Sequence, residues 1–323
     1  MHLTGIHHLS AITATASAIN RFYTQTLGLR RVKKTVNQDD TSTYHLSFAD
    51  GVGSPGTDLT FFDWPVGRER RGTRSISRTG LRVDEASLDY WAGRLRERDL
   101  AVGGIDMIDG RAGLDFEDPE GQRFRLTADR SGDSHPCERS PVPAEHQIRG
   151  LGPITISVPD LGPTEAVLTQ VMGMRRVRDY ASPDDVGRVH VFEMGAPQTG
   201  IVGKDGGGAA AELHVAVQPD LPVAQQGAGG VHHVAFRVPD AEALHGWTQR
   251  LNDFRIPSSG EVERYYFRSL YFREPAGILF EIATDTPGFA VDEPLATMGE
   301  ALSLPPFLEP RRAQIEAGLK PLD

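Results

Sequence analysis

The chain has 323 residues and a formal net charge of −10, from 34 Lys and Arg against 44 Asp and Glu. Its 39% hydrophobic and 24% charged residues exclude a generally disordered chain and a collagen-like fibre, and its length favours two domains. The acidic balance argues against a nucleic-acid partner, and no apolar run approaches the ~18 residues of a membrane span.

The first predicted unit consists of a strand, a helix and further strands. Residues 6–13 are apolar and suited to a strand. A helix follows, because apolar side chains recur there at i, i+3, i+4 and i+8, and Gly28 is placed to end it. These helix positions are Ile19, Phe22, Tyr23 and Leu27. Short strands are then expected at residues 43–48 and 59–62, separated by the turn-forming residues 51–56.

Three further units repeat this order of elements. Their strands are expected at residues 81–83 and up to Leu126 in the second unit, at 154–158, 189–193 and 212–217 in the third, and at 231–238, 265–272 and 278–282 in the fourth. Their helices contain Trp91, Val171 and Trp247. Loops or linkers are expected at residues 128–147, 206–211 and 218–230.

An internal repeat supports these four units. Residues 27–32 recur as residues 172–177, and residues 118–121 recur 156 positions later as residues 274–277. Helix anchors match at that same second offset, pairing Leu88, Trp91 and Leu95 with Leu244, Trp247 and Leu251. The chain is therefore interpreted as a duplicated half with two units in each copy. The expected division is two units in residues 1–130, a linker in 131–149, two units in 150–286, and a wrapping tail in 287–323 with a helix at 309–318.

Paired histidines open the first strand of two of the units. They are His7 and His8 in unit one and His232 and His233 in unit four. The positions that match His8 and His233 in units three and two are Pro153 and Ser77, and neither is an expected ligand. The imidazoles are thus present in only two of the four copies.

A carboxylate accompanies the second histidine pair. Strand alternation points Glu281 away from its apolar neighbours, and its match in unit two is Arg125. Taken singly, such residues are usually hydrogen-bonded histidines and solvent-facing carboxylates. Together, two histidine pairs and one Glu at matched strand positions favour a metal site.

These residues resemble those of the vicinal-oxygen-chelate superfamily, the group of glyoxalases, bleomycin-resistance proteins and extradiol dioxygenases. The resemblance covers about residues 5–285 and implies an α+β fold of four βαβββ modules. The modules would form two open β-cups, with helices outside and a metal in one cup. The implied ligands are His8, His233 and Glu281. His233 is chosen over His232 because it stands seven residues before Asp240, as the family's spacing requires. His8 is chosen over His7 because it holds the matching position in the duplicated sequence.

A narrower resemblance links the chain to ring-cleaving hydroquinone dioxygenases. That group includes dichlorohydroquinone dioxygenases and bacterial quinone-detoxification proteins. The matching segments are residues 5–8, 56–64, 281–284 and 299–306.

Two imidazoles and one carboxylate leave positions open for substrate and O2, which is typical of non-haem Fe(II) sites. Glyoxalase-type lyases usually have a fourth ligand, but residues 59–62 offer no carboxylate before Asp63. We therefore expect a ring-cleaving dioxygenase that uses Fe(II), with Mn(II) as the second choice, and acts on a hydroquinone-type aromatic. The alternatives are an extradiol catechol dioxygenase, a glyoxalase-like metal lyase or isomerase, and a metal-free binding protein.

The same resemblance implies roles for residues near the metal. Tyr271 would hydrogen-bond the substrate phenolate, and Arg264 would stabilise charge on the second oxygen. His7 would act as acid or base or contact the substrate, although a strand bulge is needed to turn it inward. His232 is a candidate neighbour of the ligand group. His45 could line the cup, or it could lie in the core or on the surface.

The ligands also predict how the units pair. His8 and His233 lie 225 residues apart, so a shared metal requires unit one to pair with unit four, leaving units two and three to form a metal-free cup. A metal shared between neighbouring chains is the rival arrangement, and the sequence leaves a homo-oligomer open. The single cysteine, Cys137, excludes an internal disulfide, and the first four residues lack the basic region of a signal peptide. We expect a cytoplasmic protein.

Overall fold

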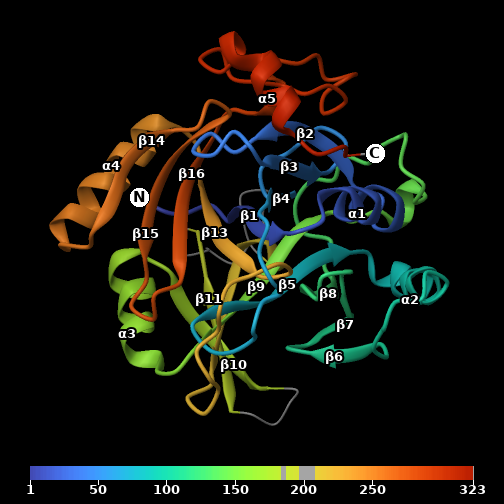
Figure 1. Ribbon diagram of the computed structural model, residues 1–323. Coiled ribbons are helices and arrows are strands. Elements are labelled where there is room, and N and C mark those ends of the chain that lie inside the picture. The colour runs from blue at the N-terminus through green and yellow to red at the C-terminus, as the bar shows by residue number, and fades with distance from the viewer. Residues whose placement is uncertain (183–186, 196–207, 323) are drawn as a thin grey trace.

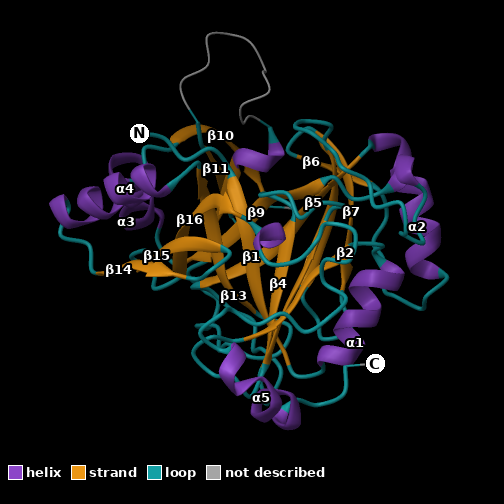
Figure 2. Cartoon of the chain, turned by 90° about the horizontal axis from the view of Figure 1, so that it is seen from above, coloured by secondary structure: helices purple, strands orange, loops and turns teal. Residues whose placement is uncertain are grey.

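The computed structural model describes residues 1–182, 187–195 and 208–322. Its strands form two eight-stranded sheets, ordered β14-β15-β16-β13-β1-β4-β3-β2 and β10-β11-β12-β9-β5-β8-β7-β6. The sheets fill the centre of the molecule, with α3 and α4 on one side and α1 and α2 on the other (Figure 2). This is the α+β architecture that the sequence predicts.

Unit one has the predicted strand–helix–strand order. Its elements are β1 (Ile6–Thr13), α1 (Ala16–Arg21), η1 (Phe22–Thr26), β2 (Arg30–Val36), β3 (Tyr44–Ala49) and β4 (Asp58–Asp63). The predicted helix is thus present, but its second half is a π-turn, in which Leu27 N–H donates to the Phe22 carbonyl. Gly28 follows at φ +72°, the left-handed conformation expected of a residue that ends a helix.

The other units repeat this pattern (Figure 1). Unit two comprises β5 (Ser75–Val83), α2 (Leu88–Arg96), β6 (Asp106–Ile108), β7 (Arg111–Glu117) and β8 (Arg123–Ala128). Unit three comprises β9 (Gly150–Val158), α3 (Leu161–Ala166), the π-turn η4 (Val167–Val171), β10 (Arg175–Ala181), β11 (Arg188–Glu193) and β12 (Glu212–Val217). Unit four comprises β13 (Val231–Val238), α4 (Ala241–Asp253), β14 (Ser258–Glu263), β15 (Phe267–Arg273) and β16 (Leu279–Pro287). Part of the loop predicted at residues 206–211 lies outside the described residues.

Each sheet joins one unit from the first duplicated half to one unit from the second. β1 of unit one pairs antiparallel with β13 of unit four, and β5 of unit two pairs antiparallel with β9 of unit three. The predicted pairing of unit one with unit four is therefore confirmed. It brings the two histidine-bearing strands side by side.

The two units of each half contact through their helices instead. Arg94 on α2 donates to the carbonyls of Gln25 and Thr26 at the end of η1, and Arg250 on α4 donates to Gln170 at the end of η4. Arg94 and Arg250 stand 156 positions apart, at the offset of the sequence repeat. Each arginine satisfies carbonyl groups that a helix end leaves without partners.

The tail after β16 contacts β2 and contains α5 (Arg312–Gly318), after which the chain continues to its C-terminal end (Figure 1). Arg31 donates to the Gly299 carbonyl at 2.8 Å, and Ser303 N–H donates to the Lys34 carbonyl at 2.9 Å. Leu308 and Ile315 pack on Val36 of β2 in a small apolar cluster. The expected helix in residues 309–318 is thus present as a 3-10 turn followed by α5. Within the described part of the chain, every helix is too short or too polar to cross a membrane.

Candidate active site

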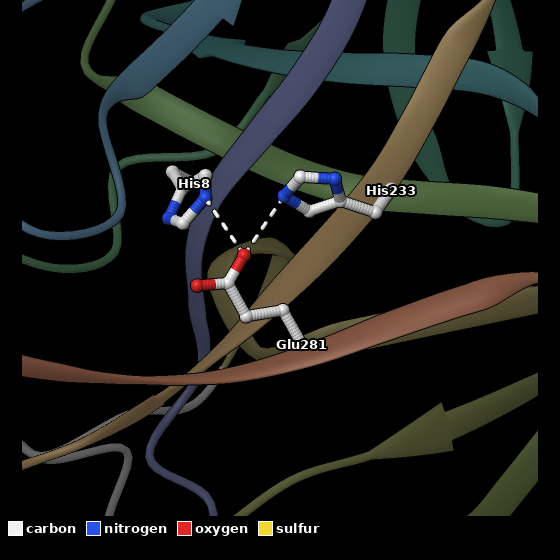
Figure 3. Close-up of side chains that lie close together, drawn as sticks. All are labelled: His8, His233 and Glu281. Atoms are coloured by element: carbon white, nitrogen blue, oxygen red, sulfur yellow. Dashed lines mark ion pairs between the residues drawn. The ribbon is translucent and has the colours of Figure 1, made fainter. Parts of the chain in front are cut away.

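Three adjacent strands bring the predicted ligands together inside the first sheet. His8 is on β1, His233 on β13 and Glu281 on β16, and all three side chains are buried. Glu281 Oε2 lies 3.3 Å from His8 Nε2 and 2.8 Å from His233 Nε2 (Figure 3). Two ligand atoms at right angles, each ~2.0–2.2 Å from a metal, would be separated by about 3 Å. The spacing therefore suits a single metal ion.

The hydrogen bonding of this group also fits a metal. Both carboxylate oxygens of Glu281 and Nε2 of His233 are buried, and none of them has a partner in good hydrogen-bond geometry within residues 1–182, 187–195 and 208–322. Buried polar atoms are rarely left in this state, and a cation would satisfy these atoms together. Burial alone would raise the pKa of Glu281, but His8 and His233 hold it well below its usual range. The carboxylate is thus kept ionised and ready to bind a cation.

Each of the two candidate histidine ligands has a neighbouring histidine within hydrogen-bond distance. His7 Nδ1 lies 2.9 Å from His8 Nδ1, and His232 Nδ1 lies 2.7 Å from His233 Nδ1. Burial, followed by the charge of the adjacent histidine, lowers the pKa of both His7 and His232 to about 3, so both are neutral. A ligand that binds through Nε2 carries its proton on Nδ1 and can donate it to the neighbouring ring.

The chain of hydrogen bonds is longer on the His7 side. His7 Nε2 lies 3.1 Å from the carbonyl oxygen of Thr284 and can donate to it. A register shift between Ile6 and His8 supplies the bulge that the inward turn of His7 requires. However, His7 borders a small cavity of about 40 Å³ and not the larger cavity that His8 and His233 line. In this structure its position suits a residue that orients His8.

The main cavity, of about 340 Å³, opens beside His8 and His233. Its apolar lining consists of Phe62, Trp64, Phe267, Leu279 and Phe289. Its polar lining includes His45, His232, Arg264 and Tyr271, together with Lys33 of β2. A cavity of this size, with aromatic side chains on its wall beside polar and charged ones, suits a small molecule that has both apolar and polar groups.

Tyr271 and Arg264 lie together on the unit-four side of this cavity. The Tyr271 ring is 5.7 Å from the ring of His233, edge to face, and the Arg264 guanidinium is 5.6 Å from the Tyr271 ring. Burial and the charge of Glu281 raise the pKa of Tyr271, so its hydroxyl stays protonated. Arg264 also forms an ion pair with Asp39 of the β2–β3 loop at 3.0 Å. The structure thus brings both predicted residues to the cavity.

Lys33 also lines the cavity, and its sequence pattern did not predict this position. It is fully buried, with Nζ 2.7 Å from Asp292 Oδ1, paired with Glu293, and 4.6 Å from the centre of the Tyr266 ring. Both carboxylates come from the tail, so the tail forms part of the cavity surroundings.

The position for a fourth ligand carries a hydroxyl. In unit four, Glu281 pairs with Ala235, the residue two positions after His233. In unit one, the residue two positions after His8 is Ser10, and its strand partner is Thr60. Ser10 and Thr60 hydrogen-bond to each other at 2.8 Å. Thr60 thus occupies the place that a second carboxylate would take.

A buried carboxylate does lie on β4 before Asp63, which corrects the expectation that none is present near this strand. Asp58 begins β4, one position before the stretch expected to hold a ligand, and pairs in register with His8. It is not among the side chains that converge as a candidate metal group.

The second cup also contains a group with metal-ligand side chains, namely Asp109, Glu212 and His214. Here the carboxylates already have cationic partners, since Arg111 donates to both oxygens of Glu212 at 2.7 and 2.9 Å. Arg178 forms close ion pairs with Asp109 and Glu212. Although burial alone would raise the pKa of Glu212, His214 and Arg111 hold it well below its usual range. That the second cup is metal-free stays a prediction.

Comparison with known proteins agrees with this geometry. The family model for the Glyoxalase/Bleomycin resistance protein/Dioxygenase superfamily matches residues 150–282. MhqA of Bacillus subtilis (strain 168), named as a ring-cleaving dioxygenase, is 47% identical over 100% of both chains. The chlorohydroquinone/hydroquinone 1,2-dioxygenase of Sphingobium indicum (strain DSM 16413) is 30% identical over 94% of this chain and 92% of its own.

Solved structures show the same fold. A crystal structure named as a dioxygenase from Bacillus subtilis subsp. subtilis str. 168 is similar with a TM-score of 0.89 at 33% identity, covering 99% of this chain and 98% of its own. Glyoxalase I from Zea mays has the same fold, with a TM-score of 0.61 at 13% identity, covering 87% and 92% of the two chains.

The chain therefore belongs to the glyoxalase/bleomycin resistance/dioxygenase superfamily, and the resemblance inferred from its sequence is confirmed. Within the superfamily its full-length relatives are those named as ring-cleaving dioxygenases, which supports an enzyme of the oxygenase class.

Proposed function

We propose that this protein is a non-haem Fe(II)-dependent dioxygenase that cleaves the ring of a hydroquinone-type aromatic with O2. The observation that carries the proposal is the ligand group of His8, His233 and Glu281, with Thr60 where a fourth ligand would be. Three ligands on one face leave room for substrate and O2 together, whereas a metal lyase of the glyoxalase type would use a fourth protein ligand. A relative named as a hydroquinone dioxygenase supports this substrate class.

His8, His233 and Glu281 would hold the metal, with Fe(II) preferred and Mn(II) as the second choice. When bound, Fe(II) would order substrate and O2 side by side and accept electron density from the ring. His7 and His232 would keep the proton of each ligand on Nδ1, because each lies within hydrogen-bond distance of that atom. Nε2 of each ligand is then free for the metal.

The remaining side chains bind and orient the substrate. Phe62 and Trp64 stack in parallel, with ring centres 5.0 Å apart, and offer a flat wall to an aromatic ring. The protonated Tyr271 hydroxyl would donate to the substrate oxygen near the metal, and Arg264 would stabilise the negative charge that develops on the second oxygen. The catalytic assignments of Tyr271 and Arg264 are part of the proposal.

The direct test is oxygen uptake. Protein loaded anaerobically with Fe(II) is mixed with hydroquinone or catechol in air-saturated buffer, and O2 consumption is measured with an electrode. We expect one O2 consumed per ring opened with hydroquinone and a much slower rate with catechol. Faster turnover of catechol would favour an extradiol catechol dioxygenase. No O2 uptake with either compound by iron-loaded protein would contradict the proposal.

A second test addresses the ligands. We expect about one Fe(II) or Mn(II) per chain by elemental analysis, and its loss in His8→Ala, His233→Ala and Glu281→Ala. His214→Ala is the matched control, because it removes a histidine from the candidate group of the second cup, and it should keep full occupancy. Full metal content in any of the three variants would remove that residue from the ligand set. Wild-type protein that takes up no metal would favour the metal-free binding protein.

A further inference from the structure

His45 lies on the wall of the main cavity, on β3 of unit one. Its ring stacks on Phe62, with centres 4.4 Å apart and an interplanar angle of 19°, and Phe62 stacks in turn on Trp64. Phe62 also contacts the ring of His233, with centres 6.5 Å apart. The parallel rings therefore extend from beside a proposed metal ligand to His45.

Nε2 of His45 is buried and has no hydrogen-bond partner among the described residues. An unmade hydrogen bond at a buried polar atom costs ~1–3 kcal/mol, so such an atom in a cavity wall calls for an explanation. A ligand in the cavity would supply the missing partner.

Two other polar side chains of the cavity wall already have partners. Lys33 is paired with Asp292 and Glu293 of the tail. The side-chain amide of Gln38 donates to the Arg264 carbonyl at 2.8 Å. Among the described residues, Nε2 of His45 and Oγ1 of Thr35 are buried atoms of this wall without a partner, and of the two only His45 belongs to the stack of rings next to Phe62.

The imidazole of His45 is neutral. Burial, followed by the charge of His8 and His233, lowers its pKa to about 3. Nε2 of a neutral imidazole is either a donor or an acceptor, and a phenolic hydroxyl can act as either. A hydroxyl can therefore pair with His45 whichever ring nitrogen carries the proton.

Building on the proposed function, we propose that Nε2 of His45 hydrogen-bonds the ring hydroxyl that lies opposite the oxygen bound at the metal site. A para-dihydroxybenzene has one oxygen at each end of the ring, so one can reach the metal while the other reaches the far wall. A catechol has adjacent hydroxyls, which both face the metal and leave none for His45. His45 then determines the preference for hydroquinones.

The test compares two ligands in two proteins. Binding of hydroquinone and of phenol, which lacks the opposite hydroxyl, is measured by anaerobic calorimetry on metal-loaded wild type and His45→Phe. Phenylalanine keeps a flat ring that can stack on Phe62 but removes Nε2. A neutral hydrogen bond contributes ~0.5–1.5 kcal/mol, so we expect hydroquinone to bind wild type about 3–10-fold more tightly than phenol. In His45→Phe this advantage should vanish, while phenol affinity and metal content stay unchanged.

His245→Phe provides the control, because it makes the same substitution on the exposed surface of α4 and should alter neither affinity. A retained preference for hydroquinone in His45→Phe would overturn the role of His45, as would an equal loss of affinity for both ligands. The wild-type comparison needs no variant, and equal binding of the two ligands would also overturn it. If wild type binds neither ligand, the proposed function itself fails and the role of His45 fails with it.

Discussion

Asp58 provides a quantitative test of the electrostatics beside the ligand group. It is 2% exposed, and neither of its carboxylate oxygens has a hydrogen-bond partner in the described part of the chain. Burial raises its pKa to about 7, partly offset by the charge of His8. In the unfolded chain an Asp has a pKa of about 3.9. The folded protein therefore favours the protonated acid over the carboxylate.

The sign of the pH dependence follows. Below about pH 4 Asp58 is protonated in both states and folding carries no penalty. Between about pH 4 and 7 the unfolded chain releases the proton while the folded protein retains it, so stability falls as pH rises. Above about pH 7 the penalty is complete. Three pKa units at ~1.4 kcal/mol each correspond to about 4 kcal/mol at most.

We therefore expect Asp58→Asn to stabilise the metal-free protein at pH 8 by up to ~4 kcal/mol and to have little effect near pH 4. The free energy of unfolding would be measured by urea titration across this range for both proteins. Asp89→Asn, which neutralises an exposed aspartate of α2, should give no such pH-dependent gain. A stability difference that is constant with pH, or largest at low pH, would refute the assignment of Asp58 as a buried neutral acid.

Three further outcomes are expected. Tyr271→Phe and Arg264→Ala should keep the metal while kcat falls ~10²–10⁴-fold, and near-normal kcat in both would move the proton transfers to another group, with His7 the next candidate. Lys33→Met should destabilise the protein by ~3–5 kcal/mol and speed protease cleavage of the tail, because it leaves Asp292 without its buried cation; unchanged cleavage would contradict the tail contact. His7→Phe should weaken metal affinity ~10–100-fold without removing a ligand, and an unchanged affinity in a competition titration would show that His7 does not orient His8.

The convergence of His8, His233 and Glu281 could be predicted from the sequence because the duplication supplies an internal comparison. His8 and His233 stand at matched positions of two units, and strand alternation directs Glu281 to one face. A shared metal then requires units one and four to pair, which the sheet order confirms. These inferences need only the period of a strand and the position of each residue in its unit.

The cavity lining could not be predicted in the same way. Lys33 lies in a run of basic residues that would suit a solvent-exposed strand, and a register shift between Arg31 and Lys33 changes which side chains face inward. Its partner Asp292 is in the tail, and no pattern in the sequence connects residues so far apart. The unpaired nitrogen of His45 likewise depends on which neighbours surround it.

The π-turns show a similar limit. The spacing of Ile19, Phe22, Tyr23 and Leu27 predicts a helix, and a helix is present. Over so few turns, apolar spacing does not distinguish a regular α-helix from one with an i→i−5 hydrogen bond. The same turn occurs in unit three at Val167–Val171, so the feature belongs to the duplicated unit.

The two cups differ in what balances their buried carboxylates, and this difference bears on metal binding. In the second cup Glu212 is paired with Arg111 and Arg178, and a guanidinium cannot lose its proton to make way for a metal. In the first cup the partners of Glu281 are imidazoles, which become ligands when they are neutral. A cation entering the first cup would replace a proton, whereas in the second it would have to displace two arginine side chains. The same fold can thus hold a metal in one cup and a closed ion-pair network in the other.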